Sequence, residues 1–133
     1  MAIHATRRAA VEQGDTAIVF GAGTVGLLTA AMAKMSGATT VVIVDIDHGR
    51  IQYALRNGFA HKGFVVPSRQ NASEASEQFS SAKDFAADVM EVASLGDADF
   101  EGADLTFDCT GKEVCMQAGL FVSDVTRCAI VRL

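Results

Sequence analysis

The sequence predicts an α/β domain built on a doubly wound parallel sheet of about five strands. Continuous β-favouring runs at 16–20 and 40–44, apolar after an initial threonine, are typical of parallel strands that are covered on both faces. Helix-forming segments separate these runs, and such alternation indicates right-handed crossovers within one sheet. A glycine-rich turn at 21–26 joins the first strand to a crossover helix. The length of 133 residues suits a single domain over 1–133.

The first third of the chain is predicted to contain two helices and one strand. Residues 3–12 favour a short helix, and Gly14 is its expected C-terminal glycine. The strand at 16–20 is followed by a helix over 24–36, for which Gly37 is a natural stop. Four apolar residues of this helix repeat at helical spacing and predict its core-facing stripe: Val25, Leu28, Met32 and Met35.

The later elements continue the alternation. The second strand, 40–44, ends at Asp45, and the helix over 48–57 is expected to bury Ile51 and Leu55. The remaining elements are expected in this order: a strand near 63–66, the longest helix, a strand at 104–109, a helix near 112–122 and a fifth strand at 127–132. The longest helix follows a Ser-rich stretch, and five residues share its apolar face: Phe79, Ala82, Ala86, Val89 and Ala93.

The glycine turn follows the pattern Gly-x-Gly-x-x-Gly, and each glycine has a physical task. Gly21 permits the tight turn out of the strand, and Gly23, which has no Cβ, lets the backbone approach a ligand. Gly26 lets the following helix lie close to the sheet. The pattern alone is weak evidence, but between a buried strand and an amphipathic helix it predicts a Rossmann-type dinucleotide site.

The start of the helix after this turn is the predicted phosphate site. Its first N–H groups have no partner within the helix, and the helix dipole adds about half a positive charge there. The N–H groups of Thr24 and Val25 are the expected donors to a pyrophosphate.

Asp45, 19 residues after Gly26, is the predicted ribose acceptor. Its carboxylate can accept hydrogen bonds from both hydroxyls of an adenosine ribose. It would repel the 2′-phosphate of NADP by about 4 kcal/mol at 4 Å and an effective dielectric of 20, so NAD is the expected cofactor. Ile46 supplies no cation for that phosphate. Arg50 can bind phosphate, stack on adenine or pair with a neighbouring carboxylate.

A second ligand-facing turn is expected after the fourth strand, because ligands bind at the carboxyl ends of parallel strands where the strand order reverses. Thr110 is the candidate there, with the nicotinamide half as its expected ligand. Cys109 ends an apolar strand with no base close in sequence, so we interpret it as a buried or spectator thiol. The sequence offers no catalytic residue.

Composition limits the partners and the location. Twelve of the sixteen acidic residues lie in 71–133, and the formal net charge is −5, which argues against a nucleic-acid surface. The three cysteines have no C-x-x-C pair, which argues against a disulfide framework or a structural zinc site and favours a cytoplasmic location. No apolar run is long enough to cross a membrane.

Several weaker patterns receive a simpler interpretation. The two arginines near the start faintly resemble a mitochondrial presequence, but helix formation explains them better. The histidines lack ligand spacing, and the acidic residues at 97–104 lack the glycine and glutamate of a calcium loop. No metal ligand is therefore predicted.

Taken together, several segments in order resemble the cofactor domain of zinc-dependent medium-chain dehydrogenases, in particular the polyol branch of sorbitol, xylitol and arabinitol dehydrogenases. The segments that carry the resemblance are 11–16, 18–26, Val44-Asp45-Ile46-Asp47 with Arg50, and Asp108-Cys109-Thr110-Gly111. The resemblance runs from about residue 3 to about residue 120.

The resemblance implies roles and a reaction. Val25 would contact the pyrophosphate, Asp45 would bind the adenosine ribose, and Arg50 would help to hold that end. The implied reaction is the reversible oxidation of a secondary alcohol or polyol by NAD, in which a zinc-bound alkoxide passes hydride to the nicotinamide.

Two departures from the family lead us to expect a truncated and inactive chain. The zinc-bearing catalytic domain that precedes the cofactor domain has no counterpart before residue 1, so zinc is expected for the full-length family but not for this chain. Residues 123–127 replace the family's Gly-Gly turn, and the sixth strand is missing, so the sheet is expected to be incomplete at its C-terminal edge. An unpaired edge strand would favour a homo-oligomer.

Two other functions remain open at this point. One is a non-enzymatic or degenerate nucleotide-binding module. The other is a methyltransferase, although methyltransferases usually lack the close third glycine at Gly26.

Overall fold

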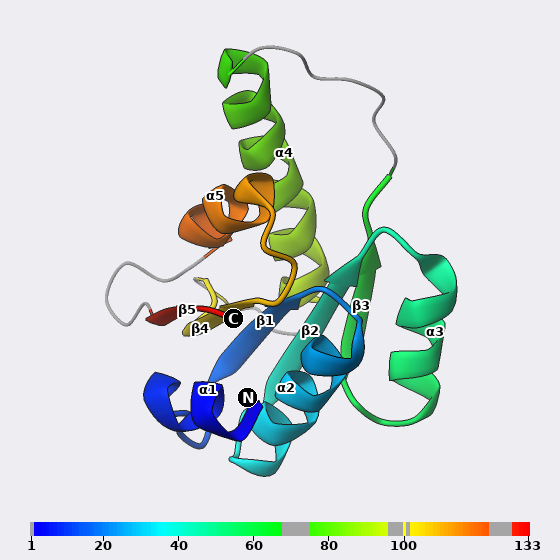
Figure 1. The fold of residues 1–133 in the computed structure, drawn as a ribbon, viewed down its shortest axis with the longest axis vertical. Coiled ribbons are helices and arrows are strands. Elements are labelled where there is room, and N and C mark those ends of the chain that lie inside the picture. The colour runs from blue at the N-terminus through cyan, green and yellow to red at the C-terminus, as the bar shows by residue number, and fades with distance from the viewer. Residues whose placement is uncertain (1, 68–74, 96–99, 101, 123–128) are drawn as a thin grey trace.

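The chain forms one five-stranded parallel sheet with helices on both faces (Figure 1). The computed structural model describes residues 2–67, 75–95, 100, 102–122 and 129–133. The strands are β1 (Thr16–Phe20), β2 (Thr40–Asp45), β3 (Lys62–Val65), β4 (Leu105–Asp108) and β5 (Ala129–Arg132). The helices are α1 (Ala2–Ala9), α2 (Thr24–Met35), α3 (His48–Arg56), α4 (Ala75–Ser94) and α5 (Glu113–Val122).

The strand order β3-β2-β1-β4-β5 confirms the doubly wound fold. The chain builds outward from β1 through β2 to β3 and then returns to the other side of β1 with β4 and β5. The order therefore reverses between β1 and β4, which is where this class of sheet binds ligands.

The two faces of the sheet are buried under different helices. Helices α1, α2 and α3 cover one face, and α4 and α5 cover the other (Figure 1). Neighbouring residues of β1 point to opposite faces, so Val19 packs in the first core cluster and Ile18 in the second. Every residue of β1 is buried, as its unbroken apolar run predicts.

The predicted core-facing stripe of α2 is wrong. The buried residues of this helix are small ones at helical spacing: Gly26, Thr29, Ala30 and Ala33. Leu28 and Met35 are instead 50% and 79% exposed. Small residues face the sheet because Gly26 approaches the carbonyl group of Gly21 too closely for any side chain to lie between them.

Two smaller expectations are also corrected. Helix α1 ends at Ala9 rather than near Gly14, because Ala10 adopts the left-handed conformation that ends the helix, with a φ of 50°. Helix α3 buries Ile51 as predicted, but its second buried residue is Ala54, and Leu55 is 40% exposed.

Helix α4 has the predicted apolar face as far as it is described. Ala82, Ala86, Val89 and Ala93 are buried, whereas Phe79 lies outside the described side chains. The Ser-rich stretch, most of the acidic turn and the replaced glycine turn, at 68–74, 96–99, 101 and 123–128, also lie outside the described residues. Among the described helices, none is both long and apolar enough to cross a membrane.

Candidate functional site

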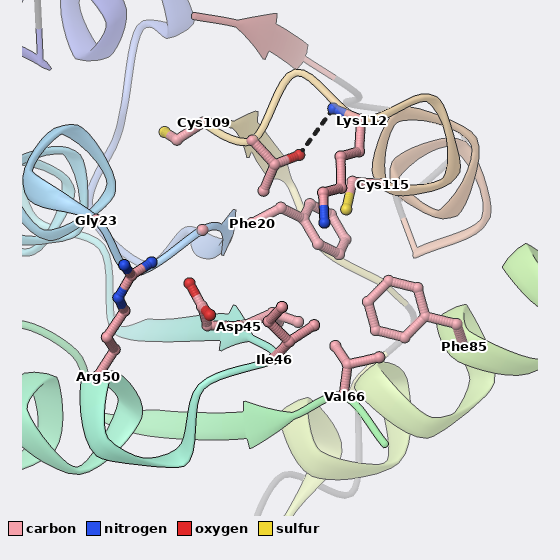
Figure 2. Close-up of a pocket in the computed structure, with 13 residues that line it drawn as sticks. Phe20, Gly23, Asp45, Ile46, Arg50, Val66, Phe85, Cys109, Lys112 and Cys115 are labelled. Carbon is pink, nitrogen blue, oxygen red and sulfur yellow. Dashed lines mark hydrogen bonds between the residues drawn. The ribbon is translucent and has the colours of Figure 1, made fainter. Parts of the chain in front are cut away.

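A cavity of about 300 Å³ opens at the carboxyl ends of the strands, where the strand order reverses (Figure 2). It extends across the ends of β1, β2 and β4, and helices α3, α4 and α5 each contribute side chains to it. Its lining residues are Phe20, Gly21, Gly23, Val44, Asp45, Ile46, Arg50, Val66, Phe85, Cys109, Thr110, Lys112 and Cys115. Five of the eight predicted site residues therefore line one cavity within the cleft predicted for a ligand: Gly21, Gly23, Asp45, Arg50 and Thr110. The other three, Thr24, Val25 and Gly26, are not among its lining residues.

The three glycines of the turn have the conformations and contacts that their spacing predicts. Gly21 has a φ of 102°, which lies in the region that favours glycine. A Cβ on Gly26 would overlap the carbonyl group of Gly21, so only glycine allows this close packing. Around Gly23, by contrast, no atom lies within 4 Å of the place a Cβ would take. The backbone at Gly23 is therefore open to an approaching ligand.

The start of α2 offers hydrogen-bond donors beside this open position. Gly23 is the N-cap residue and its helix start has no side-chain cap. The first helical bond runs from the N–H of Leu27 to the carbonyl of Gly23. Within the described part of the chain, no acceptor bonds the N–H groups of Gly23, Thr24 or Val25. Unpartnered N–H groups at a helix start form an anion site.

The carboxylate of Asp45 lies directly against the glycine turn. Its Oδ2 accepts a hydrogen bond from the N–H of Ala22 at 2.7 Å, and its Oδ1 accepts one from the N–H of Asp47 at 2.9 Å. The side chain is partly exposed and lines the cavity. The structure thus brings the predicted ribose acceptor into contact with the turn that leads into the predicted phosphate site.

Arg50 lies on the opposite rim of the cavity from the α4 and α5 side chains. Figure 2 shows its side chain rising from α3 beside Gly23 and Asp45. Asp47, the N-cap of α3, accepts a hydrogen bond from the backbone N–H of Arg50 at 3.1 Å and so fixes the first turn that carries it. A guanidinium in this place can face a phosphate or an adenine ring.

The turn after β4 is organised by a buried carboxylate. Asp108 is 1% exposed, and its Oδ1 accepts hydrogen bonds from both the N–H and the hydroxyl of Thr110, at 3.0 Å and 2.7 Å. The Thr110 hydroxyl in turn accepts the N–H of Lys112 at 3.1 Å (Figure 2). The Thr110 methyl group lies next to Gly21, so the two turns that border the cavity are packed together.

The two described cysteines of the cavity are poor nucleophiles. Burial raises the pKa of the Cys109 thiol to about 11, and burial also raises the pKa of Cys115. A thiol with a raised pKa forms little thiolate at neutral pH. The interpretation of Cys109 as a spectator thiol is consistent with this geometry.

Sequence reasoning missed part of the cavity wall. Val66, Phe85 and Cys115 come from segments that contact the turn only after folding, and Phe85 is further fixed by ring contacts with Phe20 and Phe64. Lys112 could have been found, because it directly follows the turn that the strand order predicts to face the ligand.

The described residues contain no group of three or more His, Cys, Asp or Glu side chains that could hold a metal ion. The His, Cys, Asp and Glu side chains of the described residues therefore do not fit the zinc ion that the family resemblance implies. His61 has a structural role instead, because its Nδ1 accepts a hydrogen bond from the N–H of Val41 at 2.9 Å.

Comparison with known proteins gives the same assignment at the level of family. Residues 24–126 match the family described as "Zinc-binding dehydrogenase". Sorbitol dehydrogenase 1 of Saccharomyces cerevisiae is 36% identical over 123 residues, and D-xylulose reductase A of Aspergillus oryzae is 33% identical over 122 residues. Each alignment covers 92% of this chain but only 30% of the relative. The chain thus spans about a third of the length of these relatives.

Solved structures agree on the fold. A protein from Sinorhizobium meliloti 1021, solved bound to NADP, aligns with a TM-score of 0.71 and 20% identity, over 99% of this chain and 34% of that one. Galactitol-1-phosphate dehydrogenase from Escherichia coli aligns with a TM-score of 0.63 and 20% identity, over 98% and 32%. On the evidence of its glycine turn, its strand order and the family match across most of its length, the chain belongs to the zinc-binding dehydrogenase family.

Proposed function

We propose that this chain is the NAD-binding part of a polyol or secondary-alcohol dehydrogenase. The observation that carries the proposal is the contact between the Asp45 carboxylate and the glycine turn, at 2.7 Å from the N–H of Ala22. Through this contact, a ribose acceptor and Gly23, the first of the unpartnered N–H donors, border the same cavity. An adenosine diphosphate needs both kinds of group, an acceptor for its ribose and N–H donors for its diphosphate, in one site.

The proposed cofactor is NAD rather than NADP. A fold neighbour holds NADP, so the fold alone does not decide between the two. The deciding group is Asp45, whose carboxylate would repel a 2′-phosphate, while the neighbouring Ile46 is exposed and carries no charge. Arg50 at the rim is proposed to hold the adenosine end by stacking on adenine or by bonding a phosphate oxygen.

The proposed phosphate donors are the N–H groups of Gly23, Thr24 and Val25. Gly21 and Gly26 shape the turn that presents them, and Thr110 is proposed to contact the cofactor from the β4 side. Thr110 borders the same cavity as Asp45, and its assignment to the nicotinamide half stays a prediction.

The proposed reaction of the whole protein is reversible hydride transfer between NAD and a sugar alcohol, as the names of the polyol relatives suggest. Zinc would supply the Lewis acid that lowers the pKa of the alcohol in that reaction. No residue set described in this chain fits that ion, so we propose that the chain alone binds cofactor without turnover.

Titration of the purified chain with NADH and NADPH, followed by nicotinamide fluorescence, tests the proposal. We expect NADH to bind at least about tenfold more tightly, because even a fraction of the charge repulsion at Asp45 amounts to over 1 kcal/mol. Asp45→Ser should reduce this ratio, and Asp47→Ser, which removes a nearby charge, should not. If the wild-type chain bound NADH and NADPH equally tightly, Asp45 would not be the group that selects NAD.

The same preparation tests the prediction about turnover. With added zinc and sorbitol or xylitol, we expect no reduction of NAD, and measurable NADH formation would contradict this. We further propose a cytoplasmic location from the cysteine pattern, and self-association through the outer edge of β5, which sedimentation velocity would detect.

A further inference from the structure

The Asp45 carboxylate is bonded on both of its oxygens by backbone N–H groups from different segments. Oδ2 bonds the N–H of Ala22 in the glycine turn, and Oδ1 bonds the N–H of Asp47 at the start of the α3 connection. The carboxylate therefore links two loops that lie 23 residues apart in sequence. A ribose acceptor that served the ligand alone would need neither bond.

The glycine turn is tied to the end of β2 at two consecutive peptides. The N–H of Gly21 bonds the carbonyl of Val44 at 2.7 Å, and the next N–H, of Ala22, bonds the side chain of Asp45. Ala22 is 2% exposed, so water cannot readily replace the carboxylate as an acceptor. The turn is thus held by Gly26 from the helix side and by Asp45 from the strand side.

We infer that Asp45 is a positioning residue for the diphosphate-binding turn in addition to its proposed contact with the ribose. This inference rests on the proposed function, because it concerns the same cofactor site. The hydrogen bond to Ala22 fixes the peptide that precedes Gly23, and Gly23 begins the row of N–H groups that face the open position. Loss of the carboxylate would then weaken phosphate binding even for a ligand that offers no ribose hydroxyls.

The chemistry of possible replacements makes this role hard to substitute. Asparagine at position 45 has one acceptor oxygen and one donor NH2, so one of the two backbone N–H groups would face another donor. Serine has a single, shorter hydroxyl that cannot reach both partners. A substitution that removes the repulsion toward NADP should therefore also disorder the turn, and the NADPH affinity should rise little.

Two nucleotide probes separate the two roles of Asp45. ADP offers diphosphate and ribose hydroxyls, whereas 2′,3′-dideoxy-ADP offers the diphosphate without those hydroxyls. Affinities for both are measured on the full chain and on Asp45→Asn by displacement of NADH or by calorimetry. We expect dideoxy-ADP to bind Asp45→Asn at least about fivefold more weakly than it binds the wild-type chain, because the charged acceptor of the Ala22 N–H is replaced by a neutral amide and a donor then faces one of the two N–H groups. An equal affinity of the two chains for dideoxy-ADP would overturn the inference while leaving the ribose role intact.

Asp47→Ser is the matched control. It removes one negative charge next to the cavity but keeps a capping hydroxyl and the N–H that bonds Asp45. Both probes should bind this variant within about twofold of the wild-type chain. An equal loss in Asp47→Ser and Asp45→Asn would assign the effect to charge alone and overturn the inference.

Amide exchange in the wild-type chain gives a readout that needs no variant. The Ala22 amide should exchange with solvent deuterium at least about tenfold more slowly than the Gly23 amide, because only Ala22 has a bonded acceptor. Equal exchange of the two amides would overturn the inference even if Asp45→Asn failed to fold. If the wild-type chain binds neither NADH nor ADP while the Ala22 amide is protected, the proposed function fails. The hydrogen bond between Asp45 and Ala22 then has a structural role only.

Discussion

Gly26 faces the carbonyl group of Gly21 so closely that a Cβ on Gly26 would lie 2.7 Å from the carbonyl carbon. Gly26 lies in α2 and Gly21 directly follows β1, so a side chain on Gly26 could be accommodated only by shifting the helix away from the sheet. We expect Gly26→Ala to lower the free energy of unfolding by about 3 kcal/mol or more, or to prevent folding. Urea denaturation followed by circular dichroism measures this loss. Full wild-type stability in the variant would contradict the close packing.

Gly23→Ala should leave stability nearly unchanged but weaken NADH binding. No atom lies within 4 Å of a Cβ at Gly23, and its φ of −76° is available to alanine. Stability should change by less than about 1 kcal/mol, the usual range for an N-cap change. NADH binding should weaken about tenfold or more, because the methyl group would stand where a diphosphate must approach. Unchanged NADH affinity in this folded variant would show that the phosphates do not bind beside Gly23.

The fold was largely predictable because its strands are buried on both faces. The unbroken apolar run at 16–20 appears as β1 with every residue buried, and the alternation of elements gives the parallel order. The phase of α2 was not predictable from hydrophobic spacing. This helix is apolar on more than one side, so hydrophobic spacing does not decide which side faces the sheet. The close contact of Gly26 with Gly21 decides it, and it turns Ala30 and Ala33 rather than Leu28 toward the sheet.

The site residues that belong to a local sequence motif were predictable. Those that reach the cavity only through tertiary packing were not. The turn and Asp45 are predicted from spacing along the chain, and the structure brings these two segments into contact. The bond from Ala22 was not foreseen, since it depends on the side-chain direction at the end of β2. Phe85 enters the cavity from α4, 40 residues beyond Asp45 in sequence, and no local signal marks it.

Lys62 should stabilise α4 from outside that helix. Its ammonium group donates to the carbonyl of Ala93 at 2.8 Å and to that of Leu95 at 2.6 Å, at a helix end with no basic residue of its own. We expect Lys62→Met to lower the free energy of unfolding by about 1 to 2 kcal/mol, because these carbonyls lose a charged donor. Urea denaturation measures the change. Lys83→Met, on the exposed side of α4, is the control, and an equal effect there would contradict a specific cap.

Cys109 should react slowly with alkylating reagents. Burial raises its pKa to about 11, two units above the ordinary value of 9.0, so the thiolate fraction at pH 8 falls roughly a hundredfold. Mass spectrometry of peptides after timed treatment with iodoacetamide measures the rate at each cysteine separately. A Cys109 rate equal to that of a free cysteine peptide would show that the thiol is neither buried nor shielded.

His61 should make the chain less stable in mild acid. Burial, then the charges of Lys34 and Lys62, lower the pKa of His61 below its usual 6.5, and the neutral ring accepts the N–H of Val41. Because the folded-state pKa is the lower one, this contribution is fully present above pH 6.5. It is lost as the pH falls from there through the folded-state value.

His61→Asn isolates this effect, because the amide oxygen can accept the Val41 N–H but does not titrate. Stability should be measured by urea denaturation at pH 7.5 and pH 5.5 in both chains, which share His4 and His48. We expect the wild-type chain to lose more stability between these pH values than the variant. If both chains lose the same amount, the acid sensitivity arises elsewhere and the neutral His61 acceptor does not link β2 to β3 as the geometry indicates.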